Sequence, residues 1–271
     1  MAKDLFDLSG RAALVTGGAG ILGRGFCQGL ADFGAKVAVV DIRQEAAAEL
    51  AEELTRSTGN AAIGLAADIT NPDSVAEMAA KAEEALGPIT ILHNNAAGKS
   101  SDLLAFFAPF EEYSLDQWRE IMSVNVDGMM LVAQAVGGRM IRNGQGGSII
   151  QTSSIYGLVG PDARIYEGSE YMGVAINTPA VYSTSKAAVI GLTRWLATSW
   201  AKHGIRVNTL TPGGNESGQN DTFKNLYSSR VPMGRMGQPS EMVGALIYLA
   251  SEASSYTTGQ NIVCDGGWTA W

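Results

Sequence analysis

Short runs of aliphatic and β-branched residues recur along the chain and alternate with longer segments whose apolar residues follow helical spacing. The runs that we interpret as strands cover residues 11–17, 36–41, 62–68, 89–96, 147–154, 205–212 and 261–267. Continuous apolar strands separated by amphipathic helices predict a parallel sheet covered on both faces. Because crossovers between parallel strands are right-handed, we expect a doubly wound α/β fold with ligands at the carboxyl ends of the strands.

Distinctive polar motifs follow six of these predicted strands. TGGAGILG follows the first strand, Asp41 and Asp68 end the second and third, and NNAA, a serine pair and PGG end the next three. Packing alone does not explain such residues at six separate strand ends. The pattern therefore predicts one functional site at this edge of the sheet.

Composition narrows the class of protein. The 271 residues include 46% hydrophobic and 17% charged residues, which is typical of a globular protein with a large core. No repeat, low-complexity tract or linker divides the chain, so we expect a single domain over residues 1–271. A net charge of −8 argues against nucleic acid or an anionic membrane as the main partner.

Targeting signals and cysteines suggest a compartment. The N-terminus lacks the apolar core of a signal peptide, and we expect no apolar run long enough to span a bilayer. Cys27 and Cys264 lie far apart and lack metal-ligand spacing. We interpret them as reduced thiols of a cytoplasmic protein and expect no metal site.

Three glycines favour binding of a dinucleotide. Gly17, Gly20 and Gly23 lie three residues apart, between the first strand and a predicted helix at 21–33. Glycines here let the backbone approach a pyrophosphate, whose charge the helix N-terminus stabilises. Asp41 would accept hydrogen bonds from the ribose hydroxyls of NAD and repel a 2′-phosphate. The alternatives are an ordinary glycine turn, a helix-capping Asp41 and attraction of a phosphate by the nearby Arg43.

Tyr182 and Lys186 are candidate catalytic residues. They are spaced by one helical turn in YSTSK, as ordinary surface neighbours on a helix also can be. A phenol has a reference pKa of about 10, too high for a base at neutral pH. We expect the lysine charge to stabilise the phenolate of Tyr182 and so to lower its pKa.

Taken in order, the motifs resemble those of the short-chain dehydrogenase/reductase family from about residue 8 to the C-terminus. They are a TG motif at 16–23, Asp68, Asn94-Asn95-Ala96, Asn125, Ser154, Tyr182-x-x-x-Lys186 and Asn208 with Pro212-Gly213. The resemblance implies a Rossmann-like sheet of seven strands in the order 3-2-1-4-5-6-7. It also implies dimers or tetramers assembled through helices around 115–143 and 180–203.

The resemblance also assigns roles to single residues. Tyr182 would be the general acid/base, Ser154 would hold the substrate oxygen, Lys186 would also bond the nicotinamide ribose, and Asn125 would anchor a water beside Lys186. Family spacing favours Ser154 over Ser153. The implied cofactor-binding set is Gly17, Gly20, Ile21, Leu22, Gly23, Asp41, Asp68, Ile69, Asn95, Ala96, Tyr182, Lys186, Pro212, Gly213 and Ser217.

Two positions depart from the usual family pattern. The glycine spacing, with Ile21 where the middle glycine usually stands, is similar to that of the extended branch, which includes nucleotide-sugar epimerases and dehydratases. Ala97 replaces a glycine that is common after the NNA motif. The short chain and its segment after Asn208 instead resemble the single-domain oxidoreductases.

A long polar segment separates Ser154 from Tyr182. We interpret residues 158–180 as a substrate lid, with a subunit contact as the alternative, and residues 214–236 as a second substrate flap. Lys99 is either an anion contact or a solvated surface residue. Both polar segments favour a sugar, polyol or sugar acid as substrate.

We therefore expect an NAD-dependent enzyme that interconverts a secondary alcohol and a ketone. One alternative is an enzyme like the nucleotide-sugar epimerases and dehydratases, with tightly bound NAD. The other is a non-catalytic dinucleotide-binding module, which the intact set of four catalytic residues disfavours.

Overall fold

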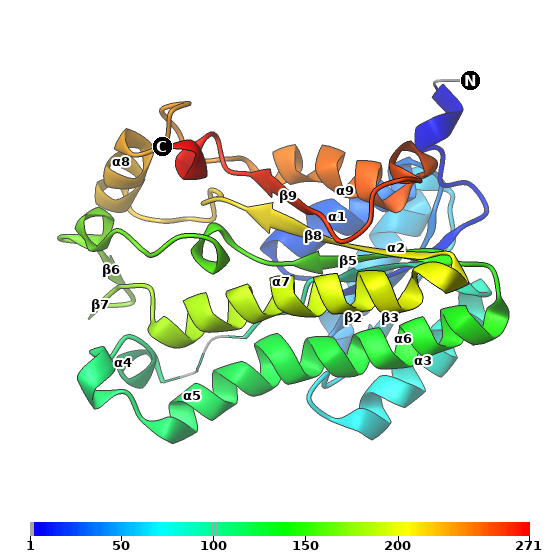
Figure 1. Cartoon of the computed structure of the whole chain (residues 1–271), viewed down its shortest axis with the longest axis horizontal. Coiled ribbons are helices and arrows are strands. Elements are labelled where there is room, and N and C mark those ends of the chain that lie inside the picture. The colour runs from blue at the N-terminus through cyan, green and yellow to red at the C-terminus, as the bar shows by residue number, and fades with distance from the viewer. Residues whose placement is uncertain (1–2, 99, 101) are drawn as a thin grey trace.

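Seven parallel strands form the central sheet of the computed structural model, which describes residues 3–98, 100 and 102–271 (Figure 1). The strands are β1 (Ala12–Thr16), β2 (Lys36–Asp41), β3 (Ala62–Ala66), β4 (Ile89–Asn94), β5 (Gly147–Thr152), β8 (Ile205–Pro212) and β9 (Asn261–Cys264). Their spatial order is β3-β2-β1-β4-β5-β8-β9, so the predicted order 3-2-1-4-5-6-7 is confirmed. Lys99 lies outside the described residues.

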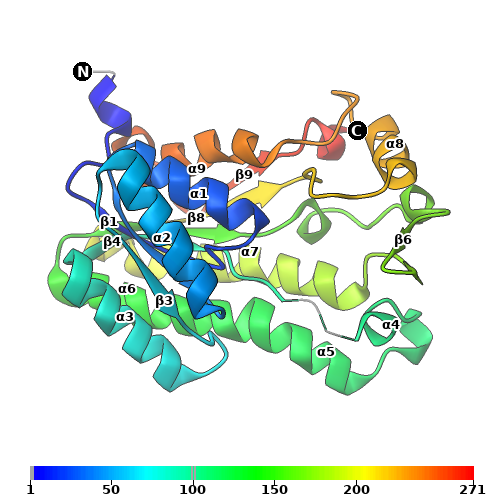
Figure 2. The same cartoon turned by 180° about the vertical axis from the view of Figure 1, so that it is seen from behind.

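Helices cover both faces of the sheet (Figures 1 and 2). They are α1 (Ile21–Asp32), α2 (Gln44–Thr58), α3 (Pro72–Leu86), α4 (Leu103–Phe106), α5 (Leu115–Met122), α6 (Met129–Asn143), α7 (Ala180–Trp200), α8 (Asp221–Ser229) and α9 (Val243–Ala250). Alternate strand residues point to opposite faces. Val15 packs in the core that α1, α2 and α9 cover, while Leu14 packs in the core that α3, α6 and α7 cover.

The longest helical segment runs from Leu115 to Asn143 through α5, a π-helical turn at Ser123–Gly128, and α6. By length and mean hydropathy it is the one helix among the described residues that could cross a membrane, which corrects our expectation that no such apolar run exists. Val132, Val136 and Met140 are buried against the sheet and α3. A core helix of a folded domain has this apolar character, so the segment is weak evidence for a membrane.

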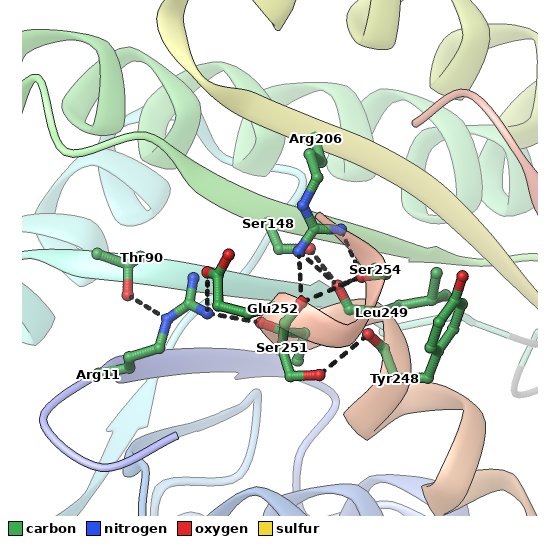
Figure 3. A network of polar contacts seen from close by, with 10 residues as sticks. Arg11, Thr90, Ser148, Arg206, Tyr248, Leu249, Ser251, Glu252 and Ser254 are labelled. Atoms are coloured by element: carbon green, nitrogen blue, oxygen red, sulfur yellow. Dashed lines mark hydrogen bonds and ion pairs between the residues drawn. The ribbon is translucent and has the colours of Figure 1, made fainter. Parts of the chain in front are cut away.

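Two arginines hold the carboxyl end of α9 at the amino ends of the strands (Figure 3). Arg11 donates from Nη1 to Ala250 O at 2.9 Å and pairs with Glu252 at 3.5 Å. Arg206 donates to Leu249 O and Ser251 O, both at 3.0 Å. Cations favour a helix carboxyl end, where the last carbonyl groups lack helical partners. This network fixes the sheet edge opposite the predicted site.

Residues 158–180 fold over the carboxyl edge of the sheet and contain a small hairpin, β6 (Glu170–Tyr171) and β7 (Val174–Ala175). The hairpin and α8 lie together at the left end of Figure 1. Ile165 of this segment packs with Phe223 of α8 and with Trp268 near the C-terminus. The segment therefore has packing partners within its own chain, and they include the predicted flap at 214–236.

Candidate active site

A cleft of about 420 Å³ opens at the carboxyl edge of the sheet, where we expected the site. Its lining residues are Gly17, Gly20, Ile21, Leu22, Gly23, Asp41, Asn95, Ala96, Ala97, Thr152, Ser153, Ser154, Tyr182, Lys186, Pro212, Gly213, Asn215 and Ser217. The structure thus gathers three of the four proposed catalytic residues and most of the proposed cofactor set in one cleft. Asn125, Asp68 and Ile69 are the predicted site residues outside this lining.

The glycine turn requires glycine at two positions. Gly17 has φ +62°, and a Cβ there would lie 2.9 Å from Ala96 Cα. A Cβ on Gly23 would lie only 2.1 Å from Gly17 O. A side chain at Gly23 would therefore push the first turn of α1 away from the turn that precedes it.

The N-terminus of α1 faces this cleft. Gly20 is the N-cap and brings no side chain to the first N–H groups of the helix. Ile21 lines the cleft and is 62% exposed. Uncapped N–H groups and the helix dipole together favour an anion such as a phosphate. The turn and the helix end therefore fit a dinucleotide pyrophosphate.

Asp41 ends β2 and is 8% exposed. Its Oδ1 accepts from the backbone N of Arg43 at 3.2 Å and from Arg43 Nε at 3.4 Å. The N-cap of α2 is Arg43, so the interpretation of Asp41 as the capping residue is wrong. The carboxylate lines the cleft, with a largely exposed guanidinium beside it.

Asp68 and Ile69 have other contacts. The Asp68 side chain is exposed and accepts from Thr70 N at 2.9 Å and from Thr70 Oγ1 at 2.7 Å. Ile69 is buried, and its Cδ1 would lie 2.8 Å from a Cβ on Gly128. In this structure the two residues shape the loop after β3, and their cofactor roles stay predictions.

Lys186 lies one helical turn after Tyr182 in α7, as the spacing predicts. Lys186 Nζ donates to Thr152 O at 3.1 Å and lies 5.9 Å from the centroid of the Tyr182 ring. Burial lowers the pKa of Lys186 to about 8. The ammonium group of Lys186 therefore lies at the cleft, where the carbonyl of Thr152 replaces part of the water that would otherwise solvate it.

The pKa of Tyr182 departs from our expectation. Burial raises it above the ordinary value of a phenol, and the hydrogen bond with Ser154 opposes this rise. We expected the charge of Lys186 to give a net lowering. The opposite direction arises because withdrawal from water dominates. It is Ser154 that stabilises the phenolate directly.

The two adjacent serines that follow β5 differ in their contacts. Ser153 Oγ donates to the main-chain O of Lys186 at 2.7 Å. Ser154 Oγ accepts from Tyr156 N at 3.3 Å and bonds Tyr182. Ser153 therefore anchors α7, while Ser154 is placed to contact a substrate oxygen beside the phenol.

Asn125 is fully buried in the π-helical turn and lies behind the cleft. Its Oδ1 accepts from Gly98 N at 2.9 Å, and its Nδ2 donates to Ser185 Oγ at 3.1 Å. Ser185 Oγ donates in turn to Tyr182 O at 2.8 Å. The side chain thus joins the loop after β4 to the helix that carries Tyr182 and Lys186, and a water held beside Lys186 stays a prediction.

Sequence reasoning missed Thr152. Its carbonyl receives Lys186, while its Oγ1 contacts His93 Nε2 at 2.9 Å and donates to Asn95 Oδ1 at 3.2 Å. The available signal was a threonine directly before the serine pair at a strand end. Lys186 lies 34 residues after Thr152, and the position of a threonine at a strand end does not reveal that its carbonyl will accept from that lysine.

Comparison with known proteins gives concordant matches. The family model described as enoyl-(acyl carrier protein) reductase matches residues 17–269. A gluconate 5-dehydrogenase of Gluconobacter oxydans (strain 621H) is 36% identical, with 98% of this chain and 97% of that protein covered. A galactitol 2-dehydrogenase (L-tagatose-forming) of Cereibacter sphaeroides is 34% identical, with 99% of each covered.

A solved structure agrees in fold over its full length. The crystal structure of a gluconate 5-dehydrogenase from Burkholderia cenocepacia J2315, in complex with NADP and tartrate, has a TM-score of 0.85 and 35% identity. The match covers 100% of both chains.

The seven-stranded parallel sheet and its strand order agree with the likeness in fold to this solved structure. The chain is an oxidoreductase of secondary alcohols and ketones that uses a nicotinamide dinucleotide. It belongs to the short-chain dehydrogenase/reductase family.

Proposed function

We propose that this protein is an NAD-dependent dehydrogenase that interconverts a secondary alcohol and a ketone on a sugar, polyol or sugar acid. The observation that carries the proposal is the placement of Ser154, Tyr182 and Lys186 in the cleft that the glycine turn also lines. A bound nicotinamide would supply the hydride acceptor or donor. The protein supplies the proton transfer and the positioning.

Each of the three side chains has a role that its contacts support. Ser154 holds the substrate oxygen close to the Tyr182 hydroxyl, with which it already shares a hydrogen bond. Tyr182 takes the hydroxyl proton during oxidation and returns it during reduction. Lys186, which is held by Thr152 O, bonds the nicotinamide ribose and keeps a positive charge near the phenolate.

Asp41 supports the choice of NAD over NADP. Its buried carboxylate suits ribose hydroxyls and repels a 2′-phosphate. The B. cenocepacia structure contains NADP, and Arg43 provides a nearby positive charge in this chain. We propose NAD because the carboxylate of Asp41 pairs with the Arg43 guanidinium at 3.4 Å and thereby offsets its positive charge.

The substrate class rests on the polar surroundings and on the names of the relatives, gluconate 5-dehydrogenase and galactitol 2-dehydrogenase. Several polar side chains of the predicted lid and flap hold these segments together. Asn220 Nδ2 donates to Glu170 O at 3.1 Å, and Asp162 pairs with Arg230 at 3.0 Å. We therefore propose that the two segments act as one preassembled cover over the substrate end.

Assembly and location are proposed on similar grounds. Trp195 of α7 is 64% exposed and Met130 of α6 is 40% exposed, which fits a dimer or tetramer formed through these helices. Cys27 and Cys264 are both free thiols, which fits the reducing cytoplasm.

A panel of polyols, hexoses, uronic acids and aldonic acids, assayed with NAD and with NADP through nicotinamide absorbance, tests this function. We expect turnover with NAD for a member of the panel and loss of turnover in Tyr182→Phe. Asp41→Asn should shift kcat/KM toward NADP. Equal activity of Tyr182→Phe and the unaltered protein would overturn the proposal.

The glycine spacing favours one second candidate, an enzyme like the nucleotide-sugar epimerases and dehydratases. Such an enzyme returns its NAD unchanged after each full turnover. Purified protein that carries NAD through gel filtration, and that converts a nucleotide sugar without net absorbance change, would support this candidate instead.

A further inference from the structure

His93 is a buried histidine at an otherwise apolar position. It lies in β4, is 0% exposed, and its ring meets Phe26 edge-on at a centroid distance of 4.4 Å. Its Nε2 lies 2.9 Å from Thr152 Oγ1, and Nδ1 has no hydrogen-bond partner among the described residues. An aliphatic side chain would fill this site without burying an unpaired nitrogen, so the Nε2 contact needs an explanation.

Counting protons fixes the direction of that contact. Asn95 Nδ2 donates to Thr16 O at 3.2 Å and Gly17 O at 3.4 Å, and since both are carbonyls, the amide cannot be reversed. The atom of Asn95 that faces Thr152 Oγ1, at 3.2 Å, is therefore the amide oxygen Oδ1. Because Oδ1 can only accept, the hydroxyl of Thr152 must donate its single proton to it. Thr152 Oγ1 can then only accept from His93, which requires the neutral Nε2–H form of the ring.

The resulting chain of donors runs from His93 through Thr152 and Asn95 to Gly17 in the glycine turn. It links β4, β5 and β1 directly beneath the cleft. The same Thr152 supplies the carbonyl that receives Lys186 Nζ at 3.1 Å. The N–H of His93 is thus connected through Thr152 to two parts of the site. One is the glycine turn that fits a pyrophosphate, and the other is the catalytic Lys186.

We propose that His93 is a positioning residue that acts as a fixed Nε2–H donor to Thr152 and thereby orients the glycine turn and Lys186 for cofactor binding. The inference rests on the proposed nicotinamide dinucleotide site. Burial lowers the pKa of His93 to about 3, so the ring stays neutral throughout the range in which enzymes are assayed. A charged ring would carry a second N–H, at Nδ1, where the described residues offer no acceptor.

Variants at His93 separate hydrogen bonding from packing. His93→Leu removes the donor and keeps an apolar side chain, whereas His93→Gln keeps an N–H at a similar reach. Ile91→Val is the matched control, because Ile91 is equally buried in β4 and faces the same core as Phe26. Thr152→Val removes the hydroxyl that links His93 to Asn95.

The measurement is the Kd of NAD by fluorescence titration, together with the KM values for NAD and substrate. Loss of one net hydrogen bond predicts a roughly 3–10-fold weaker Kd in His93→Leu. We expect His93→Gln and Ile91→Val to stay within about twofold of the unaltered protein. Combining His93→Leu with Thr152→Val should weaken binding no further than either change alone, since both break the same chain.

The outcomes are distinguishable from failure of the proposed function. If the unaltered protein binds no nicotinamide dinucleotide, the proposed function falls. If it binds NAD and a folded His93→Leu binds NAD equally well, or if the two substitutions are additive, the role of His93 is overturned. If His93→Leu does not fold, the comparison of His93→Gln with Thr152→Val decides.

A spectroscopic readout tests the tautomer without any activity. The chain has only two histidines, so His93→Gln assigns the remaining signals to His203 in long-range ¹H–¹⁵N spectra. We expect a protonated Nε2 and an unprotonated Nδ1 for His93, unchanged from about pH 8 to about pH 5. A proton on Nδ1, or titration in that range, would contradict the proposal.

Discussion

The hydroxyl of Ser153 donates to the main-chain carbonyl of Lys186 at 2.7 Å, so this bond holds the helix that carries Tyr182 and Lys186 against the residue that follows β5. The next residue, Ser154, bonds Tyr182, which lies one turn before Lys186 in the same helix. The two neighbouring serines therefore have different partners on α7: a main-chain carbonyl for Ser153 and the phenol for Ser154. Both serines line the cleft, and their partners distinguish them.

This division predicts different phenotypes for two alanine substitutions. Ser154→Ala should lower kcat by roughly 10²-fold, because it removes a hydrogen bond to the reacting oxygen and to the phenolate. Ser153→Ala should lower the free energy of unfolding by about 1–3 kcal/mol, since the carbonyl of Lys186 would lose a buried partner. Steady-state kinetics and urea unfolding of both variants check this. A larger loss of kcat in Ser153→Ala would reverse the assignment.

Tyr182→Phe should lower kcat by about 10²–10⁴-fold, the usual contribution of a general acid/base. Burial raises the pKa of Tyr182, so the phenol is protonated at neutral pH. Alcohol oxidation needs the phenolate, and its rate should therefore rise with pH, whereas ketone reduction needs the phenol and should fall at high pH. Initial rates in both directions across pH measure this. A flat oxidation profile in the unaltered protein would contradict it.

Lys186→Met should abolish activity and raise stability at neutral pH. The folded-state pKa of Lys186 is about 8, below its usual 10.5, so the unfolded chain binds more protons between these values. The free energy of unfolding of the unaltered protein should therefore rise as pH increases from about 8 to about 10.5. Below this window the buried charge of Lys186 destabilises the folded protein. The gain at pH 7 should be on the order of 2–3 kcal/mol, reduced by loss of the Thr152 contact.

The test compares the thermal unfolding of the unaltered protein and of Lys186→Met at neutral pH and again near the usual lysine pKa of 10.5. The advantage of Lys186→Met should shrink as pH rises. An advantage that grows with pH would show that the lysine is not destabilised by burial.

Phe223→Ala should loosen the cover over the substrate end and leave the sheet intact. Phe223 is 9% exposed, stacks on Tyr166 at 5.6 Å and joins α8 to residues 158–180. Removing a buried Phe ring costs about 3–5 kcal/mol, here concentrated in one peripheral cluster. We expect faster proteolysis within residues 158–180 and 214–236 and a raised KM for substrate, with the Kd of NAD nearly unchanged.

Leu104→Ala in α4 is a matched control, because Leu104 is 72% exposed. It should leave the proteolysis pattern unchanged. If Phe223→Ala were instead cleaved evenly along the whole chain, the result would contradict the proposal that the cover can loosen without the rest of the fold.

Apolar patterning predicted the fold because every strand is sandwiched between helices. Leu14 and Val15 are both 0% exposed although they point to opposite faces, and only a doubly covered sheet buries both. The ends of strands were harder to place. The predicted strand 147–154 ends at Thr152 in the structure, although Ser153 N still donates to Leu210 O of β8 at 2.9 Å while its side chain contacts α7.

Several site residues were also readable from local sequence. Gly17 and Gly23 are fixed by steric limits of the turn itself, and the spacing of Tyr182 and Lys186 is fixed by the helix. Asp68 also has a contact that strand-end position does not reveal, because its side chain accepts from Thr70 in the loop after β3. Its proposed contact with the cofactor stays a prediction.

By itself the sequence determined the sheet, its doubly wound topology, the edge that carries the site and the identity of the groups able to do chemistry there. These features follow from periodicity and steric rules that act within a few residues. Only the tertiary structure decided that Ser153 contacts the main chain of Lys186 while Ser154 contacts the phenol of Tyr182, that burial raises the pKa of Tyr182, and that His93 reaches Asn95 through Thr152. The direction of a hydrogen bond and the loss of water on burial both depend on groups that the fold brings together from distant parts of the chain. A local sequence pattern contains no information about such neighbours.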